Sequence, residues 1–196
     1  MQASNSGRLH FFIIIMSECY MDLIGKRIKL KKFSFSLEAK KLYKKWFSNS
    51  IIRKQMGYIG EFDEGDIERW EKSQQEKPNQ FLFNIVLNQS ERIIGMTSIT
   101  LEGNRNIGEI EILIGEENFQ NRGLGTETMR LLVAYCFEEL HLETIKLRVI
   151  KENIKAINCY KKIGFVCNDT QVKKCIEDNK TMEMNIMNCS EVNYDL

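Results

Sequence analysis

The stretch Gln120-Asn121-Arg122-Gly123-Leu124-Gly125-Thr126 lies between a predicted strand at residues 107–114 and a predicted helix at residues 126–140. Its two glycines permit backbone conformations that other residues avoid, so successive N–H groups can converge on an anion where the helix begins. The helix dipole and the Arg122 side chain add positive charge at the same place. The stretch therefore predicts a phosphate-binding loop, although the same glycines would also suit a plain turn from strand to helix.

Two familiar phosphate-binding motifs do not fit this loop. A dinucleotide fingerprint needs a third glycine where Thr128 stands, and a P-loop needs a Gly-Lys-Ser/Thr sequence that the chain lacks. The loop is therefore expected to hold another class of phosphate carrier.

Apolar periodicity around the loop predicts a mixed chain of strands and helices. Upstream, strands are expected at residues 24–33, 81–87, 92–101 and 107–114, and helices at residues 37–47 and 63–77. Downstream, we expect a helix at 126–140, a strand at 144–150, a helix at 153–163, a strand from residue 165, a turn at 177–179 and a last strand at 181–187. The strands from 81 to 114 read as an antiparallel meander, and residues 107–150 as a right-handed β-α-β unit with parallel strands. The sequence thus predicts an α/β (α+β) fold with a mixed, mainly antiparallel sheet flanked by helices.

Composition and length indicate a globular protein with one domain. The chain has 196 residues, 43% of them hydrophobic and 28% charged, with one proline. We expect a single domain at residues 21–190, an uncertain N-terminal extension at residues 1–20 and a C-terminal tail at residues 191–196. The apolar run at residues 9–16 is shorter than the roughly 20 residues that a membrane-spanning helix needs.

The net charge and the cysteines limit the classes of partner and the cell compartment that we expect. Basic and acidic residues number 28 and 27, so no overall field predicts a nucleic-acid or membrane partner. The six cysteines form no C-x-x-C pair and are read as reduced thiols of a cytoplasmic protein. With only two histidines, the chain offers little material for a metal site, and none is predicted.

Two spaced motifs identify a family resemblance. Gln120, Gly123 and Gly125 match the Gln/Arg-x-x-Gly-x-Gly/Ala motif, and Asn153-x-x-Ala156-x-x-x-Tyr160-x-x-x-Gly164-Phe165 matches a second signature in the right order. The chain resembles the GNAT superfamily of acetyl-CoA-dependent N-acetyltransferases, with the closest likeness to its RimJ/RimL-type branch, over residues 24–187. The resemblance implies a GNAT fold with acetyl-CoA as cosubstrate, lying where two parallel central strands splay apart.

The same resemblance implies roles for particular residues. Glu109 would act as base, often through water, and Tyr160 would protonate the coenzyme A sulfur. Glu111 lies two residues beyond Glu109 on the same face of the strand, so the two carboxylates would raise each other's pKa or bind a cationic amine. Both could instead belong to a solvent-facing polar stripe, and members of the branch often carry glycine where Glu111 stands. The residues implied to hold acetyl-CoA are Leu113, Ile114, Gln120, Asn121, Arg122, Gly123, Leu124, Gly125, Thr126, Asn153, Ala156 and Tyr160.

The acceptor is the least readable part of the implied reaction. We expect acetyl transfer to a primary amine, either a protein N-terminus or a small amine. A polyamine or an amino sugar is the alternative acceptor, and the acidic segment at residues 61–64 would favour a cation. A hypothesis of another class is a non-catalytic acyl-CoA-binding sensor, against which the presence of Glu109 and Tyr160 argues. A monomer or a homodimer fits the sequence equally.

Overall fold

The computed structural model describes residues 22–58, 60–63, 65–74, 76–77, 79–103, 106–174 and 181–194. The predicted extension at residues 1–20 and the predicted turn at residues 177–179 lie outside the described residues. Among those described, no helix has the length and apolar character needed to cross a membrane.

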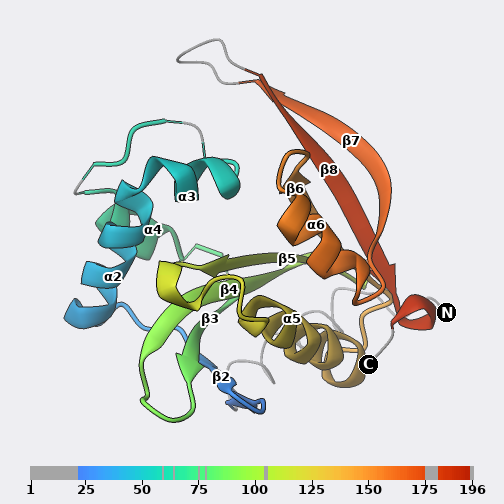
Figure 1. Ribbon diagram of the computed structural model, residues 1–196, viewed down its shortest axis with the longest axis horizontal. Coiled ribbons are helices and arrows are strands. Elements are labelled where there is room, and N and C mark those ends of the chain that lie inside the picture. The colour runs from blue at the N-terminus through green and yellow to red at the C-terminus, as the bar shows by residue number, and fades with distance from the viewer. Residues whose placement is uncertain are drawn as a thin grey trace, which may run out of the picture.

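One eight-stranded sheet, in the order β1-β2-β3-β4-β5-β6-β8-β7, runs through the described part of the chain (Figure 1). Its strands are β1 (Leu23–Ile24), β2 (Ile28–Lys32), β3 (Gln80–Leu87), β4 (Ile93–Glu102), β5 (Ile107–Ile114), β6 (Thr144–Ile150), β7 (Val166–Lys174) and β8 (Thr181–Ser190). All neighbouring strands are antiparallel except β5 and β6, which are parallel. The predicted mixed, mainly antiparallel sheet is confirmed.

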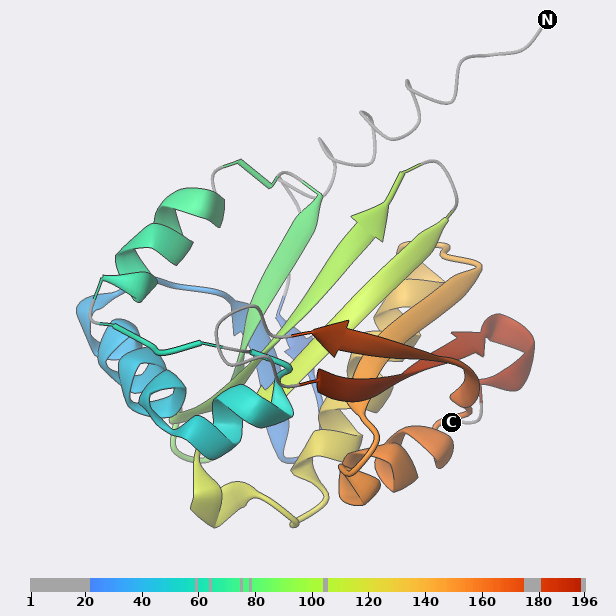
Figure 2. The ribbon, with the colours of Figure 1, turned by 90° about the horizontal axis from the view of Figure 1, so that it is seen from above.

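Helices cover both faces of the sheet and create two separate cores. The helices are α2 (Leu37–Ser48), α3 (Ser50–Gln55), α4 (Asp66–Gln74), α5 (Leu124–Ala134) and α6 (Ile154–Lys161). Figure 2 shows α2, α3 and α4 gathered on one side of the strands, where Tyr43, Trp46 and Ile67 form a mainly aromatic core. The larger core packs the apolar stripe of α5, including Met129 and Leu132, against the other face.

Most predicted elements match the structure to within one or two residues at each end, but three differ in a way that has a clear local cause. The strand expected at 24–33 is interrupted after β1 by a turn in which Gly25 N donates to Ile28 O at 2.8 Å. The helix expected at 63–77 is shorter, because Asp63 forms the turn before α4 by accepting from Gly65 N at 2.6 Å. The helix expected at 126–140 starts earlier, at Leu124, and its last turn is a π-helix at Tyr135–Glu139.

Two further differences concern helix α3 and the last strand. Helix α3 was not predicted, because its six residues are too few to show a helical period; Asn49 caps it by accepting from Ile51 N at 2.9 Å. Strand β8 runs on to Ser190, past the expected end at residue 187. Beyond it, in the segment expected as a tail, Tyr194 packs against Phe137 with ring centroids 5.5 Å apart.

The parallel pair β5 and β6 separates along its length. Paired residues are Ile107 with Thr144, Gly108 with Ile145 and Glu109 with Lys146, and no pair follows. Beyond this point β5 continues to pair with β4, as far as Ile114 opposite Gly95. Strand β6 likewise continues to pair with β8, as far as Ile150 opposite Met184. The two central strands therefore splay apart toward their carboxyl ends.

Candidate active site

The phosphate-binding loop predicted from the sequence is a tight turn at the start of α5. Asn121 and Gly123 both have left-handed backbone conformations, with φ of 58° and 77°. The first helical bond runs from Glu127 N to Gly123 O at 3.1 Å. Among the described residues, no acceptor is found for the backbone N–H groups of residues 121–126. These donors at a helix N-terminus can satisfy an anion.

Arg27, from the turn between β1 and β2, supports this loop from outside. Its Nη1 donates to Arg122 O at 2.9 Å, and its Nε lies 2.7 Å from the Glu127 carboxylate in the first turn of α5. Burial alone would raise the pKa of Glu127, but hydrogen bonds and charge from Arg27 outweigh it and lower that pKa. The loop is therefore tied to the N-terminal part of the sheet.

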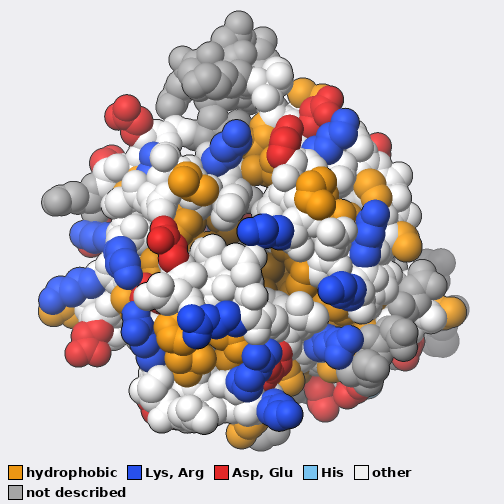
Figure 3. All heavy atoms as spheres, in the orientation of Figure 1, with side chains coloured by type: hydrophobic (Ala, Val, Ile, Leu, Met, Phe, Trp, Pro, Cys, Tyr) orange, Lys and Arg blue, Asp and Glu red, His pale blue; other side chains and the backbone are white. Residues whose placement is uncertain are grey.

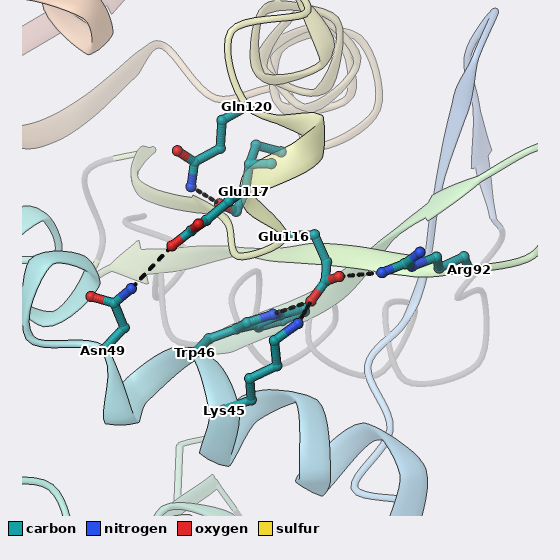
Figure 4. Close-up of polar contacts among 8 residues, drawn as sticks. Lys45, Trp46, Asn49, Arg92, Glu116, Glu117 and Gln120 are labelled. Atoms are coloured by element: carbon teal, nitrogen blue, oxygen red, sulfur yellow. Dashed lines mark hydrogen bonds and ion pairs between the residues drawn. The ribbon is translucent and has the colours of Figure 1, made fainter.

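A buried carboxylate fixes the other end of the loop (Figure 4). Glu116 is 4% exposed; it accepts from Lys45 Nζ at 2.6 Å and Trp46 Nε1 at 3.0 Å, and it also pairs with Arg92. Burial opposes its ionisation, but these three donors outweigh that effect and lower the pKa of Glu116 to about 2. Gly115 leaves room for the Trp46 ring, because an added Cβ would lie 2.2 Å from it.

Gln120 links the loop back to β5. Its Nε2 donates to Ile114 O at 2.8 Å, so the side chain shared by the family motif satisfies the last carbonyl of the strand (Figure 4). The Leu113 carbonyl instead faces β4, since a Cβ on Gly95 would lie 2.1 Å from it. Because backbone groups alternate in direction along a strand, Ile112 and Ile114 turn theirs toward the open edge of β5. Of Leu113 and Ile114, both implied to hold acetyl-CoA, only Ile114 turns its backbone groups toward that edge.

A cleft of 690 Å³ opens between the splayed strands and the two helices α5 and α6. Figure 3 shows a hollow near the middle of this face, with hydrophobic side chains inside it and basic side chains around it. The predicted residues that line the cleft are Glu109, Glu111, Leu113, Ile114, Gln120, Asn121, Gly123, Gly125, Thr126, Asn153, Ala156 and Tyr160.

Two predicted cofactor residues have side chains outside the cleft lining. Arg122 is exposed and lies over the Phe119 ring at 5.8 Å from its centroid. Leu124 is 5% exposed and belongs to the core beneath α5. Only their backbone N–H groups remain available to the loop.

The two carboxylates on β5 have different surroundings. Glu109 is held by an ion pair with Arg148 of β6 at 2.6 Å, and Lys146 Nζ lies 4.0 Å away. No ion pair joins Glu111 to any described residue. The Glu111 side chain is exposed in the cleft, but surrounding protein atoms replace much of the bulk water near its carboxylate. This burial, with nearby Glu109 adding to it, raises the pKa of the Glu111 carboxyl.

Helix α6 brings Tyr160 to the opposite wall of the cleft. Asn153 caps the helix by accepting from Ala156 N at 3.2 Å. Burial raises the pKa of Tyr160, so the phenol keeps its proton, and its ring lies 6.0 Å from that of Phe165. Next to it, Cys159 Sγ lies 3.1 Å from Thr126 Oγ1 on α5.

Sequence analysis missed several cleft residues. Arg148 alternates on β6 with core residues, Lys155 lies exposed on α6, and Lys162 lies exposed just after it. The basic character of α6 was visible in the sequence, but which basic residues face the cleft depends on how the helix packs. Met56 lines the cleft from the end of α3, which was not predicted.

A second, smaller cavity of 120 Å³ adjoins the cleft on the side of α2, α3 and α4. Met56, Glu111 and Ile112 line both spaces. In the described part of the chain, no group of three or more His, Cys, Asp or Glu side chains could hold a metal ion.

Comparisons with known proteins agree with this geometry. The family model described as "Acetyltransferase (GNAT) domain" matches residues 27–166. A Caenorhabditis briggsae N-acetyltransferase 9-like protein is 27% identical over 135 residues, which cover 63% of this chain and 67% of that protein. Spermidine N(1)-acetyltransferase of Escherichia coli K12 is 44% identical over 57 residues, which cover 29% of this chain and only 30% of that protein.

A solved structure shares the fold over most of the chain. Spermidine N-acetyltransferase from Vibrio cholerae, in complex with CoA and spermine, superposes with a TM-score of 0.75 at 18% identity, covering 87% of this chain and 99% of that one.

We expect Glu116→Ala to lower the free energy of unfolding at neutral pH by about 2 kcal/mol, the scale of hydrogen bonds to a charged group. Lys45 and Arg92 are more than half exposed and can turn to water, but Trp46 Nε1 would lose its acceptor. The lowered pKa means that this stabilisation is present above pH 4.5 and is lost as pH falls toward 2.

Urea denaturation at pH 7 and at pH 3 measures this effect. The difference in the free energy of unfolding between wild type and Glu116→Ala should be smaller at pH 3 than at pH 7. Glu117→Ala, which removes one exposed hydrogen bond to Asn49, should change the free energy of unfolding little at either pH. A difference in the free energy of unfolding that is the same at both pH values would contradict the ionised state of Glu116.

Proposed function

The chain belongs to the GNAT family of acetyltransferases, and from that premise we propose that it transfers acetyl from acetyl-CoA to a primary amine. One observation carries the proposal: the free N–H groups of residues 121–126 lie at one end of a cleft that also holds Glu111 and Tyr160. An anion-binding loop and two proton-transfer groups therefore share one space between splayed strands.

The residues present fit acetyl-CoA. Its diphosphate suits the N–H groups around Gly123, and Lys155 and Lys162 on the cleft wall add positive charge. The open edge of β5 at Ile112 and Ile114 suits the amides of a pantetheine arm, which would add to the sheet like a strand. When bound, acetyl-CoA supplies an acetyl group activated as a thioester.

Glu111 is the group best placed to accept the proton of the acceptor ammonium. Its carboxylate faces the cleft without an ion pair among the described residues, and its raised pKa makes it a stronger base than an ordinary glutamate near neutral pH.

Glu109 acts on Glu111 rather than on the amine. Its carboxylate is engaged by Arg148 and is therefore less available to the acceptor, and its negative charge helps to keep the pKa of Glu111 high. Glu109 is thus proposed as a positioning residue, a narrower role than that of the base, often acting through water, that the family resemblance implies.

Tyr160 is the proton donor on the other wall. Its hydroxyl remains protonated because burial raises its pKa, and no hydrogen bond joins it to a described residue. It can therefore donate to the sulfur that leaves as coenzyme A. The amine nitrogen loses two protons in the reaction: the first passes to Glu111 before attack, and the second restores the phenol.

We further propose a cytoplasmic enzyme of the RimJ/RimL-type branch, active as a monomer or a homodimer. Two features support this assignment: the second signature from Asn153 to Phe165, and the free thiols of Cys136, Cys159, Cys167 and Cys189. A non-catalytic acyl-CoA sensor would keep the loop without needing Glu111 and Tyr160 on facing walls.

Release of free thiol from acetyl-CoA, measured over a panel of primary amines, tests the proposed function. We expect amine-dependent release by the wild type, and calorimetry should detect acetyl-CoA binding that Gly123→Glu abolishes, because a carboxylate would then occupy a left-handed position among the anion-binding N–H groups. Binding without release for any amine would indicate the sensor, and binding retained by Gly123→Glu would remove the loop assignment.

The pH dependence of kcat/KM separates the two carboxylates. Glu111→Gln should lower the rate near neutral pH by about 10²-fold, with partial recovery as pH rises, because more of the amine is then already neutral. Glu109→Gln should instead shift the acid limb of the profile to lower pH, because the pKa of Glu111 falls when the Glu109 charge is gone.

The two variants are matched controls for each other. If Glu111→Gln keeps full activity at every pH, Glu111 is excluded as the base. If Glu109→Gln lowers kcat/KM at all pH values without moving the acid limb of the profile, Glu109 has a direct role.

A further inference from the structure

The small cavity beside Glu111 indicates which chemical group is attached to the acceptor amine. Resting on the proposed function, we infer that the acceptor is a single amine attached to an apolar group of a few heavy atoms: the ammonium lies at Glu111 and the apolar group fills this cavity.

The cavity is placed to receive the acceptor. Met56, Glu111 and Ile112 form a shared wall between it and the cleft. Ser98 lies directly opposite Glu111 in the β4–β5 register and lines the same cavity, so a hydroxyl adjoins the carboxylate there. An amine bound at Glu111 therefore has its substituent within reach of this space.

The walls of the cavity are mainly apolar, and four of the lining side chains are aromatic. Phe47 packs against Phe62, Tyr58 and Trp70, with ring centroids 6.0, 6.1 and 6.2 Å away, and all four side chains line the cavity. A volume of 120 Å³ corresponds to about four waters at ~30 Å³ each, which is room for a short alkyl or thioether group. The polar side chains of these walls, among them Gln80 and Ser98, are fewer than the apolar ones, which favours an alkyl group over the hydroxyls of a sugar ring.

The charged side chains that line the cleft and the small cavity favour an acceptor with one ammonium group over a polyamine. The carboxylates lining them are Glu109, Glu111 and Asp66. Arg148 engages Glu109, and Arg69 engages Asp66 at 2.5 Å. Only Glu111, among the described lining residues, is a carboxylate free of an ion pair, so a second ammonium of a polyamine would be desolvated without compensation.

Asp63, in the acidic segment at residues 61–64, does not supply the missing charge, because it pairs with the same Arg69 at 2.6 Å. Gln80 offers the cavity a buried Oε1 that lacks a hydrogen-bond partner among the described residues, but a neutral amide oxygen suits an N–H group rather than a full charge. The polyamine alternative is therefore disfavoured for this chain.

An apolar group beside a primary amine occurs in two sources: a polypeptide whose first residue is apolar, and a free aliphatic monoamine. Both present the same chemistry to Glu111 and to the aromatic walls. The test therefore includes leucinamide, a peptide beginning Leu-Gly and isopentylamine, with glycinamide, spermidine and glucosamine as comparisons.

Acetyl transfer is measured as kcat/KM for thiol release, and amine binding by calorimetry in the presence of CoA. We expect leucinamide to exceed glycinamide by at least about tenfold in both, the range of discrimination that methylene groups give in an apolar pocket. Higher activity with the peptide or with isopentylamine then identifies the source. Preference for spermidine or glucosamine, or equal values for leucinamide and glycinamide, would overturn the inference.

Phe62→Ala opens the cavity and should lower the leucinamide-to-glycinamide ratio about tenfold. Leu37→Ala, on an exposed part of α2 outside both spaces, is the matched control and should keep the ratio. A ratio unchanged in a folded Phe62→Ala protein would contradict the assignment. If Phe62→Ala does not fold, the comparison of amines on the wild type still decides.

Binding separates this inference from the proposed function. If leucinamide binds more tightly than glycinamide but no amine releases thiol, the proposed transfer fails while the cavity assignment stands. If thiol is released with equal efficiency for both, the transfer stands and the cavity assignment fails.

Discussion

The separation of β5 from β6 is the constraint on which the site depends. Pairing between these parallel strands ends at Glu109 and Lys146, after which each follows its other neighbour. In the pairing of β3 with β4 the register skips Ile94, whose carbonyl accepts from Gly115 N at 2.9 Å and Glu116 N at 3.1 Å, just beyond the end of β5. Glu116 then binds Trp46 on α2, so the end of β5 is held away from β6. The edge left open by this separation forms the cleft.

Charge is divided along the cleft in a way that suits the proposed reaction. Basic residues of α6 and the N–H groups at the start of α5 lie where an anionic cosubstrate would bind, and carboxylates lie on β5. Glu109 and Glu111 are two residues apart, yet Arg148 engages only Glu109. The same ion pair that holds Glu109 thereby leaves Glu111 as a base with a raised pKa beside the aromatic cavity.

The sequence predicted most of the sheet and the elements that place the loop, because those signals are local. Apolar stretches between polar turns marked β3 to β5, and alternation of apolar residues marked β6. The stripe from Met129 to Leu140 marked α5, and the glycines marked the turn before it. Other features depend on contacts between distant segments. The ion pair of Glu109 with Arg148, the bonds of Glu116 to Lys45 and Arg92, and the cavity between α2 and α4 join residues that no local pattern relates.

Amide hydrogen exchange with and without CoA tests most directly whether this opened edge and its loop receive the cosubstrate. The account predicts slower exchange on CoA addition at residues 121–126 and at Ile112 and Ile114, with little change in β7. Exchange that is unchanged at both the loop and the edge of β5, at CoA concentrations that saturate binding, would contradict it.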